Sequence, residues 1–411
     1  MDRRALASLR ASRGYPQFLV AATVARLADE MFAVGVVLLV LERTGSPALA
    51  GLTIAAATLP AIASGPVIGA WLDRTGKRSL LYKVDRLLLV ACLLGILAAA
   101  GNAPDFVVPL LGFITGITLP ATFGGLTSFI PLLVEPHLLG SANALEASSF
   151  NAALILGPAI AGTTVALGGP SAAILVEVAL TLVALVLLLR IPDLDRGGSG
   201  ATEPFVQSVK DGIGFAVREP IIRAITVPDM FGMLGSGALV VAFPLWAHAD
   251  LGVSSSAAGY LWAAFAFGSL FGALAFADRQ RRFAQDAVVL AGLFALGVMM
   301  LTWPLAASLP VALLLVGVAA VPEGPAFAAT FSVRQQRTPT ALLAHVMSTI
   351  SSLKVGCFSL GAALGGPLAE AVGPRMVLLI VAGVQLTGVV IGLAMRVAVV
   401  SPAAGAGRSA G

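Results

Sequence analysis

Charged residues are scarce in this chain of 411 residues: only 11% are Asp, Glu, Lys or Arg, whereas 58% are hydrophobic. A soluble domain carries about 25% charged residues, so this sequence cannot cover a water-facing surface. The scarcity excludes a soluble protein and predicts a polytopic membrane protein, whose spanning helices need about 20 apolar residues each. The net charge of +4 lies mostly in short gaps between apolar runs, which argues against nucleic acid as a partner.

Cysteine and histidine are also rare. Cys92 and Cys357 lie in apolar runs, which predicts buried free thiols rather than a disulfide. The three histidines are scattered, so no metal site is expected. No G-x-S-x-G nucleophile motif is found, and the TGKR stretch lacks the Ser or Thr that follows the lysine of a phosphate-binding loop. We therefore predict neither an enzyme nor a cofactor or nucleotide site.

Long apolar runs dominate what is present. Twelve of them are long enough to span a bilayer, at about 17–41, 47–71, 80–101, 106–133, 139–167, 171–190, 221–247, 257–277, 285–307, 309–331, 341–368 and 375–399. We number them as spans 1 to 12. Gly and Pro inside several runs are tolerated better in membrane helices than in soluble ones.

The longest polar gap lies between spans 6 and 7. Its GGSG piece is typical of a flexible linker. From residue 205 to 217 an apolar residue recurs every fourth position, which predicts an amphipathic helix along the membrane surface. The expected domains are a six-helix bundle at 1–190, a cytoplasmic linker at 191–220 and a second six-helix bundle at 221–411.

The two halves resemble each other. LLGSANALEASSFNAALILGPAIAGTTVALGGP and LLAHVMSTISSLKVGCFSLGAALGGPLAEAVGP align without a gap at an offset of 204 residues. Two weaker similarities accompany this match. The segment after span 8 resembles the segment after span 2, span 7 resembles span 1, and all three similarities occur in the same order in both halves. This order indicates a duplicated six-helix unit.

Lysine and arginine predict the orientation. If the N-terminus is cytoplasmic, nineteen Lys and Arg residues fall in cytoplasmic segments, whereas only Arg43 and Arg375 fall on the opposite side. Positive charge concentrates on the cytoplasmic side, so both termini are predicted inside the plasma membrane.

The segment between spans 2 and 3 reads GAWLDRTGKR. It resembles the G-x-x-x-D-R-x-G-[RK]-R signature of the major facilitator superfamily, with matches at Gly69, Asp73, Arg74, Gly76, Lys77 and Arg78. The resemblance covers essentially the whole chain. It implies the major facilitator fold: an all-α membrane protein with twelve transmembrane helices in two pseudo-symmetric six-helix bundles, expected as a monomer.

The signature suggests a conformational latch on the cytoplasmic side. In the family arrangement span 11 begins near Asp73, and a helix N-terminus favours an anion by about 0.3–1 kcal/mol. Asp73 would then hold the two halves together, with Arg74, Lys77 and Arg78 neutralising it and nearby carboxylates such as Asp85. The alternative is a plain positive anchor at the membrane surface.

Four acids lie inside apolar runs: Asp29, Glu30, Asp229 and Glu323. An acid at mid-bilayer costs about 2.5–3.5 kcal/mol on insertion scales, so it must be paired, hydrated or protonated. In the resembling family, spans 1, 7 and 10 line a central cavity. Asp29 is our first choice for proton handling. Glu30 either shares this role or pairs with Arg26 four residues earlier. Glu323 in the helix-breaking PEGP stretch either binds protons or substrate cations or lies near a membrane face as a solvated loop residue.

Other cavity residues are expected from the same resemblance. Lys354 in span 11 needs a partner, either Glu323 or Asp229, or else it contacts an anionic substrate. Phe32, Phe231, Phe243 and Phe327 would give an apolar cavity, or else face lipid or pack in the core. Span 4 carries no charge, so the arginine that such exporters often place there has no counterpart.

Span 5 contains GPAIAG, similar to the G-P-x-x-x-G element of proton-driven exporters. Gly157, Pro158 and Gly162 would let span 8 approach closely through Gly268 and Gly272, sealing against proton leak, or would serve ordinary helix packing. The resemblance thus implies an exporter of amphipathic drugs, antibiotics or siderophores that uses protons and alternating access. The alternative is an uptake or facilitated-diffusion carrier of the same fold.

Overall fold

The computed structural model describes residues 8–75, 77–120, 126–191 and 205–405. All regular elements in these ranges are helices, which confirms the predicted all-α class. The chain divides into two compact units: Met1–Thr202 with Ser256–Ala263, and Glu203–Ser255 with Ala264–Gly411. The boundary at Thr202 falls inside the predicted linker. The short segment Ser256–Ala263, at the start of span 8, belongs to the first unit, which the sequence did not predict.

The first unit is built around the pairing of its first helix with its last. It contains α2 (Tyr15–Thr44), α3 (Pro47–Thr58), α4 (Ala61–Thr75), α5 (Arg78–Ala99), α6 (Val107–Pro120), α7 (Ile130–Leu133) and α8 (Leu139–Leu189). Two 3-10 turns, Leu126–Phe129 and Pro136–Leu138, flank α7. Aromatic and aliphatic side chains of α2, α7 and α8 form a buried cluster around Phe18 and Phe129.

The turn between spans 1 and 2 follows directly from its four residues, TGSP. Gly45 ends α2 in the left-handed conformation (φ 66°), and its N–H donates to the Leu41 carbonyl. The Ser46 hydroxyl then caps α3 by accepting from the Leu49 N–H at 3.1 Å. Pro47 occupies the first turn of α3, where its missing N–H costs nothing.

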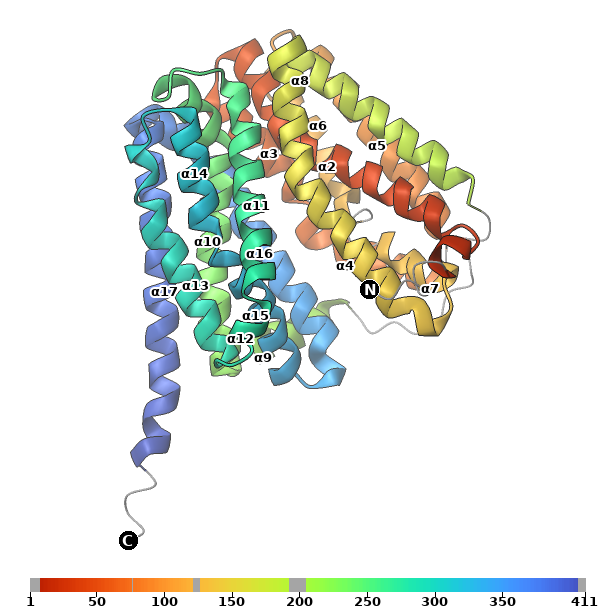
Figure 1. Cartoon of the computed structure of the whole chain (residues 1–411). Helices are drawn as coiled ribbons and strands as arrows, with labels where there is room; N and C mark the ends of the chain where they lie inside the picture. Colours follow the sequence, from red (N-terminus) through yellow and green to blue (C-terminus); the bar gives the residue numbers. More distant parts are fainter. Residues whose placement is uncertain (1–7, 76, 121–125, 192–204, 406–411) are drawn as a thin grey trace. The chain divides into compact units, whose positions relative to one another are not determined.

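Helix α8 is a bent pair of spans rather than one rod. Its 51 residues run through Gly169, whose φ of 80° and ψ of 169° break the helix, and Pro170 begins the second limb. Figure 1 shows the two limbs folded back on each other. They correspond to predicted spans 5 and 6, and the first limb stays helical through Pro158.

The second unit repeats this plan. It contains α9 (Phe205–Arg218), α10 (Pro220–Ala249), α11 (Ala258–Ala275, of which 264–275 belong here), α12 (Ala277–Gln280), α13 (Gln285–Met300), α14 (Leu309–Ala320), α15 (Glu323–Arg337), α16 (Thr340–Val372) and α17 (Pro374–Gly405). The 3-10 turn Ser255–Ala257 precedes α11, and Trp303–Leu305 follows α13.

The predicted runs coincide with these helices in their described residues. Eight segments there are both long and apolar enough to cross a membrane, one of them being the two-limbed α8, and Val107–Leu119 is shorter. Proline divides two other runs, as α3 and α4 separate before Ala61 and α14 and α15 separate around Pro322. The number twelve itself stays a prediction.

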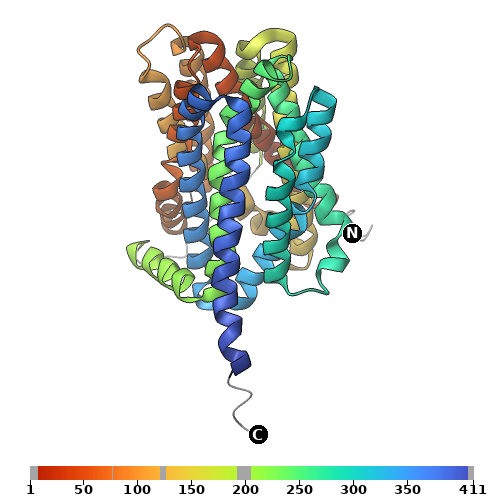
Figure 2. The same cartoon turned by 90° about the vertical axis from the view of Figure 1, so that its left-hand side faces the viewer.

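The linker helix forms where predicted. Figure 2 shows α9 running crosswise to the long helices of the second unit. Ala216 is buried in a cluster with Val346 and Ile350 of α16, and Gly212 lies so close to α16 that an added Cβ would stand 2.7 Å from the His345 carbonyl. On its outer side Ile213 and Val217 are 42% and 55% exposed. One side of α9 therefore packs on α16. The described residues of the predicted apolar stripe, Ile213 and Val217, lie on the other side and are exposed.

Glycines bring α10 and α16 of the second unit into backbone contact. A Cβ on Gly361 of α16 would stand 1.9 Å from the Leu234 carbonyl, and one on Gly237 of α10 would stand 2.0 Å from the Phe358 carbonyl. In the internal repeat Gly361 corresponds to Gly157, which likewise packs on the first helix of its own unit. The same close helix crossing in both units supports the inferred duplication of a six-helix unit.

We expect Gly361→Ala to destabilise the protein strongly, because backbone must move away from the new methyl group. Overpacking of this kind costs about 1–3 kcal/mol. The matched control is Gly383→Ala on α17, where nothing lies within 4 Å of the position that a Cβ would take. Thermal unfolding of both purified variants in detergent measures the difference. Equal unfolding temperatures would contradict the close crossing.

Candidate functional site: buried charge clusters in each unit

Arg86 of α5 is the centre of the charge cluster in the first unit. Its Nη1 donates to Asp29 of α2 at 2.8 Å, and its Nε donates to Asp85 at 2.8 Å. The side chains of Arg86, Asp29 and Asp85 are only 2%, 6% and 3% exposed. The Tyr82 ring stacks near the guanidinium at 5.5 Å. Asp29 is therefore an ion-pair partner, and Arg86 is also a partner of Asp85.

Arg26 forms a second ion pair in the first unit, and its partner is not Glu30, one of the two alternatives that the sequence left open. Its Nη2 contacts Glu146 of α8, and its Nη1 donates to the Ser149 hydroxyl at 3.2 Å. The Phe150 ring lies 5.6 Å from the guanidinium carbon. Arg26 thus turns to α8 and does not pair with Glu30, because a residue in another helix meets it with a better-placed carboxylate.

Glu30 faces the first limb of α8, where a glycine makes room for it. A Cβ on Gly157 would stand 2.5 Å from the Glu30 Cβ. Glu30 is half-buried, and the described residues give it no ion pair. It is therefore an acid inside a span with no fixed counter-cation.

The other glycine of the span 5 element faces α11. A Cβ on Gly162 would lie 2.5 Å from the Ser256 carbonyl and 3.2 Å from the Gly259 Cα. Thr163 and Tyr260 add a hydroxyl pair at 2.8 Å. Span 5 does approach span 8 closely, but the predicted partner glycines were wrong. Gly268 and Gly272 instead pack on α14, where added Cβ atoms would meet the carbonyls of Gly317 and Val321.

Asp229 of α10 is the centre of the cluster in the second unit. Its Oδ2 accepts from Arg334 of α15 at 3.0 Å and lies 2.9 Å from the Lys354 ammonium of α16. One carboxylate thus joins three helices and holds two cations. Of the two partners that the sequence left open for Lys354, the structure selects Asp229.

Glu323 is the first residue of α15, directly after the predicted helix break. Its carboxyl oxygen accepts from the Ser269 hydroxyl of α11. Gly324 allows this approach, since an added Cβ would stand 1.9 Å from the Ser269 carbonyl. Glu323 therefore lies between two spans with a neutral partner rather than at a solvated membrane face.

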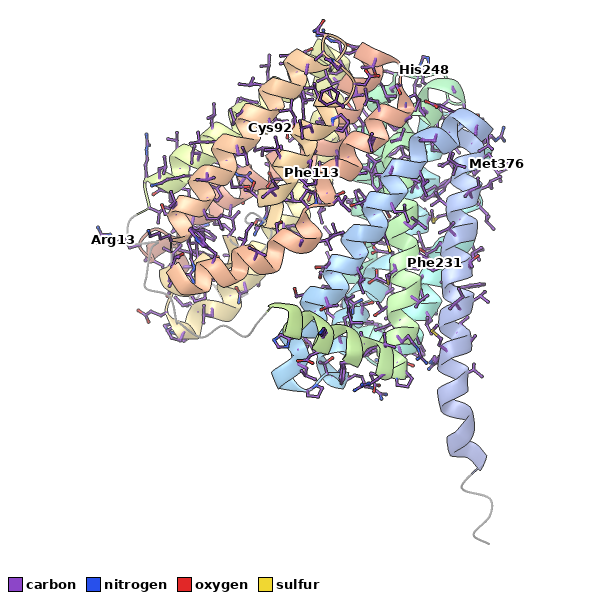
Figure 3. All side chains as sticks on the ribbon, turned by 180° about the vertical axis from the view of Figure 1, so that it is seen from behind. Arg13, Cys92, Phe113, Phe231, His248 and Met376 are labelled. Carbon is purple, nitrogen blue, oxygen red and sulfur yellow. The ribbon has the colours of Figure 1, made fainter. Side chains whose placement is uncertain are left out.

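The phenylalanines separate into two groups. Phe243 is fully buried with Trp246 and Trp303 at ring distances of 6.3 and 5.7 Å, so it is core and not cavity. Figure 3 marks Phe231 on α10, where it packs against Gly388 of α17. Phe327 is 51% exposed, and the Lys354 ammonium lies 6.0 Å from its ring.

The signature between spans 2 and 3 is described only in part. Gly69, Asp73 and Arg74 are helical in α4, but their side chains lie outside the described residues, as does Gly76 altogether. Lys77 occupies the N-cap position of α5, and Arg78 is its first residue. The latch stays a prediction.

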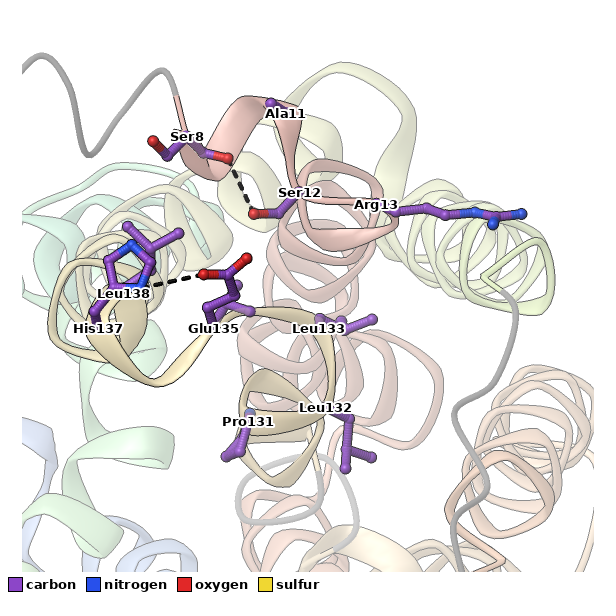
Figure 4. Close-up of a pocket in the computed structure, with 11 residues that line it drawn as sticks. Ser8, Ala11, Ser12, Arg13, Pro131, Leu132, Leu133, Glu135, His137 and Leu138 are labelled. Carbon is purple, nitrogen blue, oxygen red and sulfur yellow. Dashed lines mark hydrogen bonds and ion pairs between the residues drawn. The ribbon is translucent and has the colours of Figure 1, made fainter.

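A surface cavity of about 720 Å³ lies in the first unit, away from these clusters. Figure 4 shows it between the start of the chain, at Ser8 and Ser12, and the turn that carries Glu135 and His137. The imidazole and the carboxylate are 3.3 Å apart and mostly exposed. None of the sequence-predicted site residues lines it.

Sequence reasoning missed both central arginines. Arg334 was assigned to a cytoplasmic segment and Arg86 to the polar start of span 3, yet they are 3% and 2% exposed. In the sequence Arg334 and Arg86 each lie beside other charged residues. A role in anchoring the helix at the membrane surface explains their charge equally well. Within the described ranges no group of three His, Cys, Asp or Glu side chains could hold a metal ion, and Cys92 and Cys357 are free thiols.

Comparison with known proteins gives a consistent result. The profile of a family described as a transmembrane secretion effector matches residues 5–408. The chain is 32% identical over 368 residues to the uncharacterized MFS-type transporter y4rN of Sinorhizobium fredii, covering 87% of this chain and 89% of that protein. It is 28% identical over 352 residues to the multidrug efflux pump Tap of Mycolicibacterium fortuitum, covering 82% and 84%.

Among solved structures, a mutant of the nucleoside transporter NupG superposes with a TM-score of 0.73. The alignment covers 92% of this chain and 98% of that one, at 13% identity. This likeness shows a shared fold.

Proposed function

The chain belongs to the transmembrane secretion effector family of major facilitator superfamily transporters, and from this premise we propose that it exports amphipathic small molecules by proton antiport. Its family is one of membrane transporters rather than enzymes, and the chain is a multi-pass membrane protein. We propose the plasma membrane as its location, with both termini in the cytoplasm, and a monomer as the working unit. The name of the relative Tap supports drug-like substrates and outward transport.

One observation carries the proton part of this proposal: each unit holds an acid in a spanning helix without a fixed cation. A proton carrier must alternate between charged and neutral forms. Asp29 and Asp229 each form an ion pair with an arginine. Glu30 has no ion pair in the described residues, and the hydrogen-bond partner described for Glu323 is the Ser269 hydroxyl. We therefore propose Glu30 and Glu323 as the proton carriers, and the first-choice acid Asp29 as a fixed counter-charge.

The substrate contacts are proposed for the second unit. Phe327 offers an exposed aromatic face, and Asp229 and Lys354 keep partial exposure of 16% and 15% beside it. An apolar surface with a few polar groups suits amphipathic molecules. We also propose that Asp73 acts as the latch between alternating states.

We expect Glu30→Gln to reduce proton-driven export at least tenfold while leaving binding intact, because glutamine fills the same space but cannot release a proton. The measurement is ethidium export from inverted or energised vesicles, with and without an uncoupler. The matched control is Glu42→Gln, an exposed acid near the end of the same helix. It should export like the unmodified protein.

Three results separate the possibilities. Export by the unmodified protein that persists with an uncoupler would remove proton coupling. Unchanged export by Glu30→Gln alone would assign the proton to Glu323. Accumulation that increases in vesicles lacking any gradient would favour the alternative, an uptake or facilitated-diffusion carrier.

A further inference from the structure

Glu177 is a buried acid that neither the charge clusters nor the proposed carriers use. It lies on the second limb of α8 and is 0% exposed. Neither of its carboxyl oxygens has a hydrogen-bond partner in the described part of the chain. Sequence reasoning set it aside, because span 6 usually packs outside the cavity in the resembling family.

Helical periodicity places Glu177 firmly toward the interior of the unit. Ile174, Thr181 and Ala184 share its side of α8 and are fully buried. Leu175 and Leu182, on the opposite side, are 50% and 39% exposed. The Thr181 hydroxyl one turn further on is also buried without a described partner. The buried position of Glu177 therefore follows from its place on the helix and does not depend on the rotamer of its side chain.

The surroundings of Glu177 are apolar and tightly packed. Gly35 of α2 lies opposite: a Cβ placed there would be 3.7 Å from the Glu177 Oε2 and 3.4 Å from Ile174. Neighbouring side chains of α2 and α8 form an aliphatic cluster around Met31 and Val34. A small residue on α2 thus admits the carboxyl group between two closely packed helices.

Two charged residues act on Glu177 from the helices packed against it. They are Asp29 of α2 and Arg86 of α5. Arg86 is already shared between Asp29 and Asp85, so these three residues carry a net charge of −1. Ionising Glu177 would add a further negative charge, and neither of its carboxyl oxygens has a hydrogen-bond partner among the described residues. Burying an unpaired carboxylate costs several kcal/mol, so such a group takes up a proton instead.

We propose that Glu177 is a proton-binding site of the first unit, loaded in this conformation and electrostatically linked to the Asp29–Arg86 pair. This inference rests on the proposed proton antiport and adds a third proton position to it. Movement of Arg86 away from Asp29 would place a cation beside Glu177 and release its proton. The site would thereby couple the ion pair between α2 and α5 to proton release.

The test is infrared spectroscopy of the purified protein in lipid at neutral pH, comparing the unmodified chain with Glu177→Gln. We expect the variant to lose a carbonyl band of a protonated carboxyl group. The matched control is Glu135→Gln, whose parent side chain is 77% exposed. It should lose carboxylate bands and keep the protonated one. Loss of carboxylate bands in Glu177→Gln would overturn the proposal, because Glu177 would then be ionised.

A transport measurement distinguishes this inference from the proposed function. Glu177→Gln should lower gradient-driven ethidium export at least tenfold, while ethidium exchange without a gradient continues. Normal gradient-driven export by the variant would overturn the coupling role. If the unmodified protein exports independently of the proton gradient and still shows the protonated band of Glu177, the proposed antiport is wrong and the proton site stands.

Discussion

Replacing Arg86 by methionine is expected to leave almost no folded protein. The guanidinium joins α2 to α5 through Asp29 and compensates Asp85. Methionine fills part of the space but removes the cation that both buried carboxylates contact. Removing one partner of a buried ion pair costs about 3–5 kcal/mol, which is a large share of the 5–15 kcal/mol or so that stabilises a typical protein.

The yield of monodisperse protein in detergent and its thermal unfolding measure this effect. Arg43→Met is the matched control, because Arg43 is exposed and donates only to the Ser171 hydroxyl, at 3.1 Å. We expect a change within about 0.5 kcal/mol there. Both variants replace an arginine by methionine, but Arg86 and Arg43 differ in burial and in the number of carboxylates that they contact.

Neutralising the stranded acids should restore stability. The triple variant Arg86→Met, Asp29→Asn, Asp85→Asn removes the uncompensated charge, so it should fold better than Arg86→Met alone. Failure of this rescue would show that the guanidinium acts by packing, for instance against Tyr82 at 5.5 Å, and not by charge. A single variant as stable as the unmodified protein would contradict the cluster altogether.

The helices of this protein were predictable because each depends on local composition. Apolar runs indicate spans whatever their neighbours are, and stops such as Gly45 and breaks such as Pro322 act within a turn of their own position. The bent α8 shows the same rule, since Gly169 and Pro170 divide predicted spans 5 and 6. The repeat aligns Gly157 with Gly361, and in the structure both glycines lie at close helix crossings.

The partners of the site residues were not predictable, because they come from other helices. Four-residue spacing favoured Arg26 with Glu30, yet Glu146, 120 residues away, takes Arg26. Arg334 pairs with Asp229 across 105 residues. A sequence shows which acids enter the membrane but not which cations meet them. The buried position of Glu177 could have been recognised from the inward stripe of its helix, had the family arrangement not set it aside.

Loss of the Asp229 charge is expected to have the largest effect in the second unit. Asp229→Asn leaves Arg334 and Lys354 together without a counter-charge, and Arg334 is only 4% exposed. We expect a loss of about 3–5 kcal/mol in unfolding free energy. The matched comparison is Lys354→Met, which keeps the Asp229–Arg334 pair and removes the more exposed cation. Its cost should stay within about 1 kcal/mol.

The same pair of variants tests the proposed substrate contacts. The three charges sum to +1 in the unmodified protein, to +2 in Asp229→Asn and to zero in Lys354→Met, beside the exposed Phe327 ring. Like charge repels a cationic ligand, so Lys354→Met should bind ethidium more tightly and Asp229→Asn more weakly, as fluorescence titration of the folded fractions would show. Identical affinities would place the substrate away from Phe327, because the affinity of a cationic ligand in contact with that ring depends on a charge 6.0 Å from the ring.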